Sequence, residues 1–421
     1  MGIFSGAVDP AQRYLEVGLR VIVLRSTSQM NQFRPHTIPR PTFEGYYSKF
    51  DLPSGGRLAL IICSVPQAKT RPHMVSFTYI PPDYPDVPLF QKEIWAEDIQ
   101  MVNIDNDMLA KLGFSTSPKH KVVFELRVPN VGTMKVYDDD TTEYDISDPE
   151  RSFSFSASIA GGSGRTPWSR GSKSSTPEGM LVYLPLPLHW HVHSLASTCN
   201  FRLSIPSDLY SHLHPLDTSN TTTSIVRPPS QQLAYVHQEK NWAHSFPASH
   251  IWIQARNHTT NSGVNVAGGG IIGTDAFLIS YHGTDSLHDV SFTPPYAMQA
   301  SSSLPWPLSI ASSYSPTCAC SVSWADRQAH LEVSSLTRKI SIVASAPKDT
   351  FFGLSAPFHD GHRKNFLGQS FRAKIKVKVF KADRLGLGHW NLMCEEVFEN
   401  GSLEFGADWY GHPDKGETNP L

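Results

Sequence analysis

The chain has 421 residues, a formal net charge of −2 and only 18% charged residues, compared with about 25% in ordinary soluble domains. These values exclude a uniformly basic nucleic-acid-binding protein, although they leave room for a local basic patch. The 32 prolines and 28 glycines indicate many turns, and the five scattered cysteines are typical of free thiols in a reducing compartment. The first residues lack the features of a secretory signal, and no apolar run reaches the roughly 18 residues of a membrane helix, so we expect no membrane insertion.

Short segments of alternating apolar and polar residues recur along the chain, separated by clusters of Gly, Pro and Ser. Such segments are typical of β-strands, because successive side chains of a strand point to opposite faces of its sheet. The best candidate for a helix is residues 94–113. The segments predicted as strands are 43–50, 57–65, 74–80, 122–128, 132–137, 152–159, 180–188, 200–205, 251–255, 276–281, 290–293, 320–324 and 339–343. The sequence therefore predicts an all-β protein of sandwich type, with long loops and little helix.

A stretch with almost nothing to bury, residues 215–232, divides the chain into two halves of similar character. We therefore expect a first β-sandwich over residues 1–214, a second over 233–385 and a C-terminal extension over 386–421. Two motif pairs suggest that the halves are tandem repeats, although short alternating strands also produce such matches by chance. The motif pairs are His120-x-Val122-x-Phe124 with His288-x-Val290-x-Phe292, and Arg202–Ile205 with Lys339–Ile342.

Four aspartates lie close together in the sequence, in one predicted acidic loop. They are Asp138, Asp139, Asp140 and Asp145. Clustered carboxylates on a loop are what calcium binds, so one interpretation is a calcium site. Their spacing does not match the EF-hand pattern, and the other interpretation is a solvated acidic loop.

Three histidines, His189, His191 and His193, recur at every second position and would lie on one face of a strand. Imidazoles on one face could bind a metal, as the His-x-His pair of cupins does. The glutamate that the cupin pattern needs is missing between Ser194 and Asn200. A pH-sensing cluster and an exposed, partly aromatic strand end are the alternatives.

The segment from Phe371 to Val379 is the cleanest amphipathic strand in the sequence. Its basic face, with two cations just beyond it, consists of Arg372, Lys374, Lys376, Lys378, Lys381 and Arg384. One interpretation is an edge strand on which lysines prevent aggregation. The other is a contact surface for RNA or for an acidic partner.

The sequence offers no candidate for nucleophilic catalysis or cofactor binding. Gly162-Ser163-Gly164 lacks the strand–turn–helix context of a nucleophile elbow. Gly268-Gly269-Gly270 lacks the residues of a dinucleotide or phosphate loop. We therefore predict no catalytic residue, no cofactor and no enzyme activity.

The segment from Leu336 to Phe358 combines a strand, a small-residue step at Ala344–Ala346, Asp349 followed by Phe351-Phe352, and a Gly-x-x-x-Pro exit. It resembles the closing strand of jelly-roll coat proteins of picorna-like viruses. Val290–Tyr296 is similar to the strand of that family that runs into a Pro-Tyr before an exposed loop. Two sandwiches in one chain resemble the large coat protein of comovirus-type plant viruses.

This resemblance implies two tandem jelly-roll-like domains and a structural capsid protein that assembles into an icosahedral shell around an RNA genome. The implied partners are copies of itself, other capsid subunits, genomic RNA at the basic strand, and a host receptor. The implied location is the virion, and the host cytoplasm during assembly. Two other functions stay open. One is a carbohydrate-binding β-sandwich that stacks sugars on Trp190, Trp242, Trp252 or Trp306; the other is a cupin-type metalloprotein that uses the three histidines.

Overall fold

The computed structural model describes residues 41–103, 121–150, 152–170, 176–183, 188–206, 223–226, 233–271, 273–300, 318–383 and 389–412. Within these ranges the chain is built of β-strands, with single 3₁₀ turns at Gly162–Gly164, Gly179–Tyr183, Ser286–His288 and Lys348–Thr350. The predicted all-β class with little helix is therefore confirmed. No helix in this described part is long and apolar enough to cross a bilayer.

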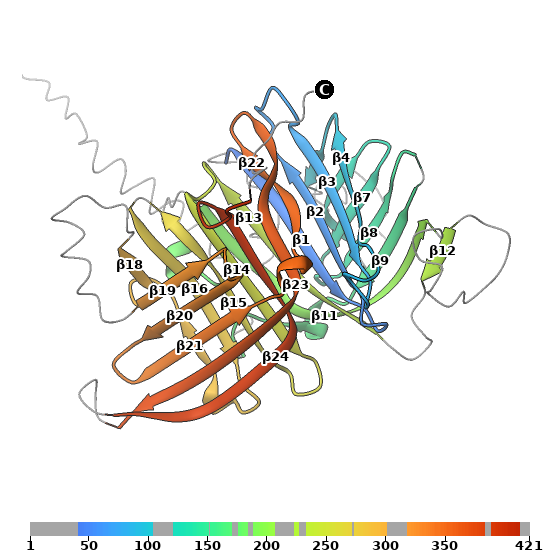
Figure 1. The fold of residues 1–421 in the computed structure, drawn as a ribbon. Coiled ribbons are helices and arrows are strands. Elements are labelled where there is room, and N and C mark those ends of the chain that lie inside the picture. Colours follow the sequence, from blue (N-terminus) through green and yellow to red (C-terminus); the bar gives the residue numbers. More distant parts are fainter. Residues whose placement is uncertain are drawn as a thin grey trace, which may run out of the picture.

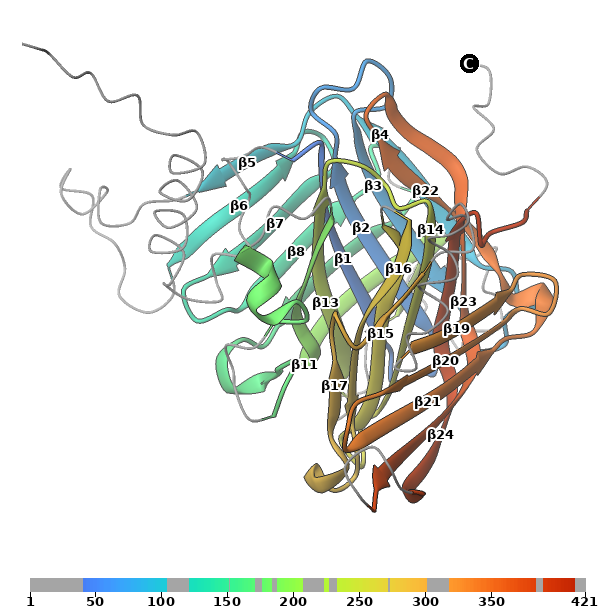
Figure 2. The same cartoon turned by 90° about the vertical axis from the view of Figure 1, so that its left-hand side faces the viewer.

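The strands form two large sheets that lie side by side (Figures 1 and 2). The described strands of the first sheet are β1 (Phe43–Asp51), β2 (Arg57–Ser64), β3 (His73–Ile80), β4 (Phe90–Ala96), β5 (Gln100–Asn103), β6 (Val122–Val128), β7 (Gly132–Tyr137), β8 (Thr142–Ser147), β9 (Ser154–Ile159), β10 (Arg165–Thr166), β11 (Leu188–Pro206), β12 (Thr223–Val226) and β13 (Ala234–Ala243). Those of the second are β14 (Ser249–Asn257), β15 (Ser262–Ile271), β16 (Thr274–His282), β17 (Val290–Phe292), β18 (Met298–Ala300), β19 (Cys318–Ser323), β20 (Gln328–Ser334), β21 (Arg338–Ser345), β22 (Phe352–Phe358), β23 (Gly361–Ala382) and β24 (Trp390–Ala407).

Both sheets follow the same path. Strands that are neighbours in the sequence are mostly neighbours in the sheet, and the first strand of each sheet pairs antiparallel with its last, β1 with β13 and β14 with β24. The path ends at β4 and β5 in the first sheet and at β17 and β19 in the second. This order is an up-and-down meander, whereas the Greek keys of a jelly roll join strands that are not neighbours.

The topology repeats, but the two sequence motifs do not mark equivalent strands. Val122 lies in β6, beyond the break between β4 and β5, whereas Val290 lies in β17, before the corresponding break. The second motif pair lies in β11, which is next to the last strand of its sheet, and in β21, which is one strand further away.

Two other sequence expectations differ from the structure. The part of the expected helix at 94–113 that is described continues β4 and forms β5, because its apolar side chains pack on the first core. The expected linker at 215–232 contains β12, which pairs with β11, and its other residues lie outside the described ranges. The chain passes from the first sheet to the second between β13 and β14.

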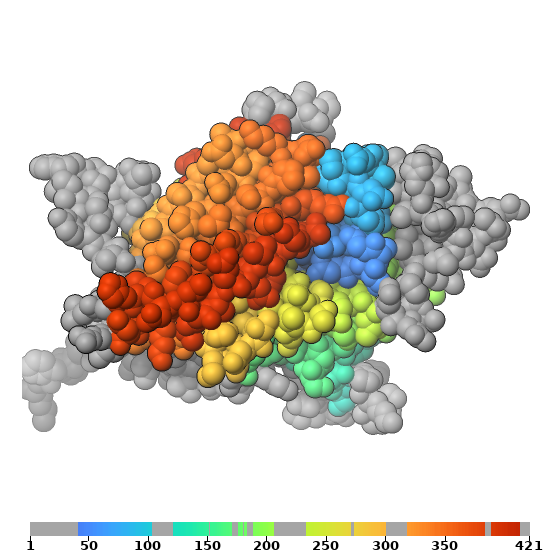
Figure 3. Space-filling view, turned by 60° about the horizontal axis from the view of Figure 1, so that its bottom comes forward, coloured from blue at the N-terminus to red at the C-terminus, as the bar shows by residue number. Residues whose placement is uncertain are grey.

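The central strands of the two sheets are buried on both faces. Tyr46 and Phe50 of β1 belong to the core of the first sheet, and Tyr47 belongs to a cluster between the sheets. In β14, Ile251 and Ile253 belong to the second core, whereas Trp252 lies between the sheets. Successive side chains of a pleated strand point to opposite faces. Each of these strands therefore contributes one row of side chains to the core of its own sheet and the other row to the cluster between the sheets. In the space-filling view, the orange and red C-terminal strands lie directly against the blue strands of the first sheet (Figure 3).

One end of the space between the sheets is closed by a group that we call the polar junction: Lys49, Asp51, Arg57, Gln254 and His258. Lys49 Nζ donates to Gln254 Oε1 at 2.7 Å and lies 3.2 Å from Asp51 Oδ1. Asp51 also contacts Arg57 Nε at 2.8 Å and His258 Nε2 at 3.2 Å. Burial lowers the pKa of the Lys49 ammonium to about 8, against the attraction of Asp51. Burial alone would raise the pKa of Asp51, but the charges of Lys49 and Arg57 hold it below its usual value.

Two buried histidines of the second sheet also bind backbone carbonyl groups of the first half of the chain. His362 Nδ1 lies 2.7 Å from Arg71 O, and His282 Nε2 lies 3.0 Å from Trp168 O. Burial lowers the pKa of each imidazole to about 4. Both side chains are therefore neutral at physiological pH.

Candidate functional site

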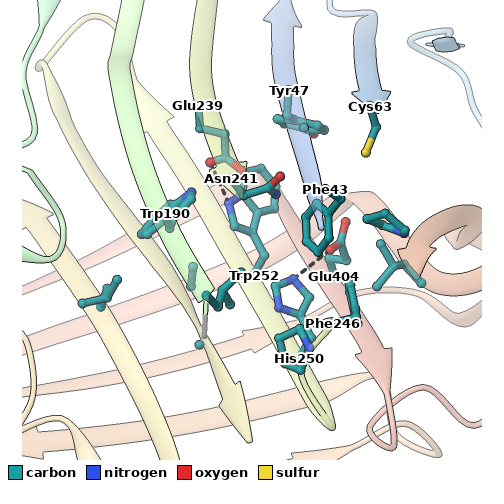
Figure 4. Close-up of a pocket in the computed structure, with 18 of the residues that line it drawn as sticks. Phe43, Tyr47, Cys63, Trp190, Glu239, Asn241, Phe246, His250, Trp252 and Glu404 are labelled. Carbon is teal, nitrogen blue, oxygen red and sulfur yellow. Dashed lines mark hydrogen bonds and ion pairs between the residues drawn. The ribbon is translucent and has the colours of Figure 1, made fainter. Parts of the chain in front are cut away.

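A cavity of about 400 Å³ lies between the two sheets. Its walls come from β1, β2, β3, β11 and β13 of the first sheet and from β14, β15, β16, β18, β22, β23 and β24 of the second. Large aromatic side chains dominate the lining: Phe43, Tyr47, Trp190, Phe246 and Trp252 (Figure 4). A concave, mostly apolar lining with a few polar groups is typical of binding sites for small molecules.

The pleat of the central strands decides which side chains reach the cavity. Phe43, Gly45 and Tyr47 are alternate residues of β1 and share the face turned to the second sheet. Glu239 and Asn241 of β13 lie directly opposite Tyr47 and Gly45 in the antiparallel register. Alternate side chains of β1 and of β13 thus form the wall that the first sheet contributes to the cavity.

The second sheet contributes a connected polar group to the cavity: His250, Glu404 and Gln369. His250 Nε2 lies 3.0 Å from Glu404 Oε1 (Figure 4). Gln369 Nε2 donates to Glu404 Oε2 at 2.9 Å. With Nε2–H donating to the carboxylate, Nδ1 of the imidazole keeps its lone pair and can accept a proton. A carboxylate that orients a histidine in this way is a common arrangement for general acid–base chemistry.

Gly406 of β24 makes room for this histidine. Residue 406 is the register partner of His250. A Cβ atom at position 406 would lie 3.1 Å from His250 Cβ and 2.4 Å from Leu367 Cδ2. Glycine is therefore required for the imidazole and Leu367 to take their places beside the cavity.

Tyr47 stands between the polar groups of the two sheets. Its hydroxyl oxygen accepts a hydrogen bond from Gln369 Nε2 at 3.3 Å, and its ring packs edge-on against Trp252 at 5.4 Å. Burial, followed by the charges of Glu404 and Glu239, raises the pKa of this phenol well above its usual value. Tyr47 therefore stays protonated and can donate its hydrogen to a bound molecule.

Glu239 is the carboxylate that the first sheet contributes beside Tyr47. Its Oε2 accepts a hydrogen bond from Trp252 Nε1 at 3.1 Å (Figure 4). It accepts another from His237 Nε2 at 2.9 Å. The first of these bonds crosses between the sheets and holds the Trp252 ring against the cavity.

The three histidines predicted as a metal or pH-sensing cluster lie on β11, outside this cavity's lining. His189 Nδ1 lies 2.7 Å from Glu178 Oε2, and its ring stacks on Trp242 at 5.1 Å. The rings of His191 and His193 are 6.4 Å apart, and both are buried. Burial, with Arg165 and Lys240, lowers the pKa of His191 to about 3. Among the described residues, no group of three or more His, Cys, Asp or Glu is placed to hold a metal ion.

The four aspartates predicted as a calcium loop do not turn toward one point. Asp138 Oδ1 accepts from Lys121 N at 3.2 Å, and Asp139 Oδ1 accepts from Thr141 N at 2.9 Å. Asp140 Oδ2 lies 3.3 Å from Arg165 Nη2. Asp145 is an exposed residue of β8. The first three therefore bind separate groups.

The predicted basic strip is a part of β23 that faces glutamates of β24. Lys374 pairs with Glu399 at 2.8 Å, and Glu395 lies 2.6 Å from Lys376 and 3.3 Å from Lys378. The other members of the strip are Arg372, which donates to Asn400 Oδ1 at 3.3 Å, Lys381, which is exposed at the end of the strand, and Arg384, which lies outside the described ranges.

Three of the tryptophans expected to stack on sugars are buried. Trp190, Trp242 and Trp252 are 5%, 7% and 4% exposed, and Trp306 lies outside the described ranges. Flat sugar rings need exposed tryptophan faces, so the carbohydrate-binding alternative is not supported. Trp190 and Trp252 instead line the cavity.

Sequence reasoning missed every polar residue of this cavity. Glu239, His250, Gln369 and Glu404 come from four strands, and no local spacing connects them. One signal was present: β13 reads AYVHQEKNWA and carries charged residues inside a strand. A charged residue in a strand buried on both faces costs free energy unless it is paired, so it often belongs to a polar network or a site.

No protein-family model matches the sequence, and no curated protein matches it. Solved structures do match the fold. CghA matches with a TM-score of 0.51 at 12% identity, over 88% of this chain and 90% of that chain. CghA with Sch210972 matches with a TM-score of 0.49 at 10% identity, over 87% and 88% of the two chains. Kievitone hydratase from Nectria haematococca matches with a TM-score of 0.46 at 10% identity, over 91% and 94%.

The match to the fold of CghA overturns the resemblance to viral coat proteins. The short motifs at Leu336–Phe358 and Val290–Tyr296 occur in antiparallel strands of a meander, where strand–turn patterns of this kind arise without common descent. Three predictions depended on this resemblance and are wrong: the capsid function, the capsid and RNA partners, and the location in a virion. The prediction that the chain is not an enzyme depended on the same resemblance and on local motifs, and it falls with the resemblance, because the shared fold is that of CghA. The chain shares the fold of CghA.

Proposed function

We propose that this protein is an enzyme that binds an apolar small molecule between its two sheets and acts on it by proton transfer. The observation that carries the proposal is the cavity, in which aromatic walls surround the connected group of His250, Glu404, Gln369 and Tyr47. The two sheets would act as two domains, divided between β13 and β14, with the site at the interface between them. Sites for small molecules are common at interfaces between domains.

The residues divide the proposed work as follows. Apolar walls remove the substrate from water, which strengthens every polar contact inside the cavity. His250 takes or returns a proton through Nδ1, and Glu404 fixes its tautomer and stabilises the imidazolium that forms. Tyr47, kept protonated, donates a hydrogen bond to an oxygen on which negative charge develops. The reaction class that fits this set is proton transfer at or next to a carbonyl, phenol or alkene.

The test uses a neutral apolar dye for binding and deuterium for chemistry. Nile red should bind with enhanced fluorescence. A panel of apolar phenols, enones and polyenes incubated in deuterium oxide should yield at least one compound that gains carbon-bound deuterium or is converted, as seen by mass spectrometry. His250→Gln should lower that rate by about 10²-fold or more, the usual contribution of a general base, and should leave the binding of Nile red unchanged.

His330→Gln is the matched control, because His330 is exposed on β20, away from the cavity lining. Its rate should equal that of the unmodified protein. Binding of Nile red with no conversion or exchange of any compound would contradict an enzyme and leave a binding protein.

A further inference from the structure

The cavity has an unbalanced set of charged side chains. Its described lining contains three glutamates, Glu178, Glu239 and Glu404, and no lysine or arginine. These glutamates are 3%, 5% and 7% exposed. A buried carboxylate without an opposite charge is costly, so a ligand that brings a positive charge would be favoured in this cavity.

Each of the three carboxylates is held in place by a histidine and by one further N–H group. Glu178 binds His189 and Trp190 N, Glu239 binds His237 and Trp252 Nε1, and Glu404 binds His250 and Gln369 Nε2. The contacts to the three histidines are 2.7, 2.9 and 3.0 Å. These partners fix the positions of the oxygens but, apart from the imidazoles, bring no charge. The site is therefore built to hold carboxylates beside an apolar space.

Gln369 supplies a second and independent observation. Its Nε2 donates to Glu404 Oε2 and to the Tyr47 hydroxyl oxygen. Since only the nitrogen of an amide can donate to a carboxylate, these bonds fix the orientation of the amide group. Oε1 is then an acceptor with no hydrogen-bond partner among the described residues, in a side chain that is 1% exposed and lines the cavity. A buried acceptor of this kind costs free energy unless a ligand or a water molecule donates to it.

The aromatic walls favour the same kind of ligand. Trp190, Trp252, Phe43 and Phe246 line the cavity together with the glutamates. The faces of aromatic rings carry partial negative charge and attract cations, most strongly where water is excluded. Acidic oxygens, an unused acceptor and aromatic faces together suit an organic cation that has N–H groups.

We propose that the molecule bound in this cavity is an apolar amine in its protonated form, whose N–H groups donate to Gln369 Oε1 and to the Glu404 carboxylate. This inference rests on the proposed function, since it names the substrate class of the same cavity. The amine would lie beside His250, and its apolar body would fill the space between Tyr47, Trp190 and Trp252.

Three compounds that share an indole ring and an ethyl chain test the charge directly: tryptamine, 3-ethylindole and indole-3-propionate. Calorimetric titration of the full chain at pH 7 should show tryptamine binding at least tenfold more tightly than 3-ethylindole, and indole-3-propionate binding most weakly. Glu404→Gln should remove the preference for tryptamine and leave the affinity for 3-ethylindole within about twofold. Glu239→Gln, at the other carboxylate, should reduce the preference in the same direction.

Glu395→Gln is the control, because Glu395 pairs with Lys376 and Lys378 on β24 and does not line the cavity. It should keep the full preference for tryptamine. Equal affinities of the three compounds, or tightest binding of the acid, would overturn the amine inference and leave the proposed function standing. If none of the three compounds nor Nile red binds, both are overturned, because the cavity then takes no apolar ligand. Near-UV circular dichroism of each variant confirms that it is folded.

Discussion

The two ends of the space between the sheets are built from the same strands in opposite ways. At one end, Phe43 and Tyr47 of β1 face His250 and Trp252 of β14 across a cavity. A few residues further along the same face of each strand, Lys49 meets Gln254 at 2.7 Å in the polar junction. Short directional contacts hold the sheets together at the junction, and rigid rings hold them apart at the cavity.

The difference shows how an open cavity can persist between two cores. Apolar walls alone would favour closing the space, since packed interiors contain few voids. The polar junction fixes the spacing of β1 and β14 at one end, and the bond from Trp252 Nε1 to Glu239 fixes a ring at the other. The comparison predicts that junction variants affect stability and that cavity variants affect binding.

The largest effect is expected from breaking the polar junction. Lys49→Ala removes a 3%-exposed cation and leaves Gln254 Oε1 and one side of Asp51 unpaired. Breaking a buried ion pair by removing one partner costs about 3–5 kcal/mol. Urea unfolding should therefore show a loss of this order in the free energy of unfolding.

The matched control is Lys374→Ala, which removes a lysine that pairs with Glu399 where both side chains are 61% exposed. It should cause no measurable change, because exposed ion pairs contribute little. Equal effects of the two variants would show that the polar junction does not hold the sheets together.

A smaller effect for each residue is expected from acid, through the two histidines that bind the other half of the chain. In the unfolded chain a histidine takes up a proton below about pH 6.5, whereas folded His282 and His362 do so only near pH 4. The unfolded state thus binds more protons in this window, so stability should fall as the pH falls from about 6.5 to 4, by up to about 3 kcal/mol for each residue.

Urea unfolding at pH 7 and at pH 4.5 measures this loss. His362→Gln should reduce the difference in the free energy of unfolding between pH 7 and pH 4.5. His330→Gln, at an exposed position, should leave that difference unchanged. An unchanged pH dependence in His362→Gln would contradict the assignment. Neither histidine lines the cavity, so the loss of stability at acid pH should appear whether or not Nile red is bound.

The smallest change in stability is expected from filling the cavity. Ala267 of β15 lines the cavity and is 9% exposed. Ala267→Leu adds volume where space exists, so the free energy of unfolding should change by less than about 1 kcal/mol. Titration with Nile red should show at least a tenfold loss of affinity. A stability loss as large as that of Lys49→Ala, with binding intact, would reverse the comparison.

Local pattern carried much of the fold prediction. The strands expected at 43–50, 57–65, 74–80 and 339–343 match β1, β2, β3 and β21 closely, because alternation and turn residues are properties of neighbouring positions. The prediction of a helix from residue 94 was wrong because it also depended on local pattern alone. Its weak periodicity could not reveal that Ile94 and Met101 pack on a core formed by distant strands.

The sequence by itself determined that the chain is all-β and that its strands are numerous, but not that β11, β23 and β24 are as long as 19, 22 and 18 residues. Only the tertiary structure decided that β1 and β14 are buried on both faces, so that Tyr47 and Trp252 meet between two cores. It also decided that Glu239, His250, Gln369 and Glu404 surround one cavity. The physical reason is range. Alternation is fixed between adjacent residues, whereas these four side chains come from two different sheets, and the bonded pair His250 and Glu404 is 154 residues apart in the sequence.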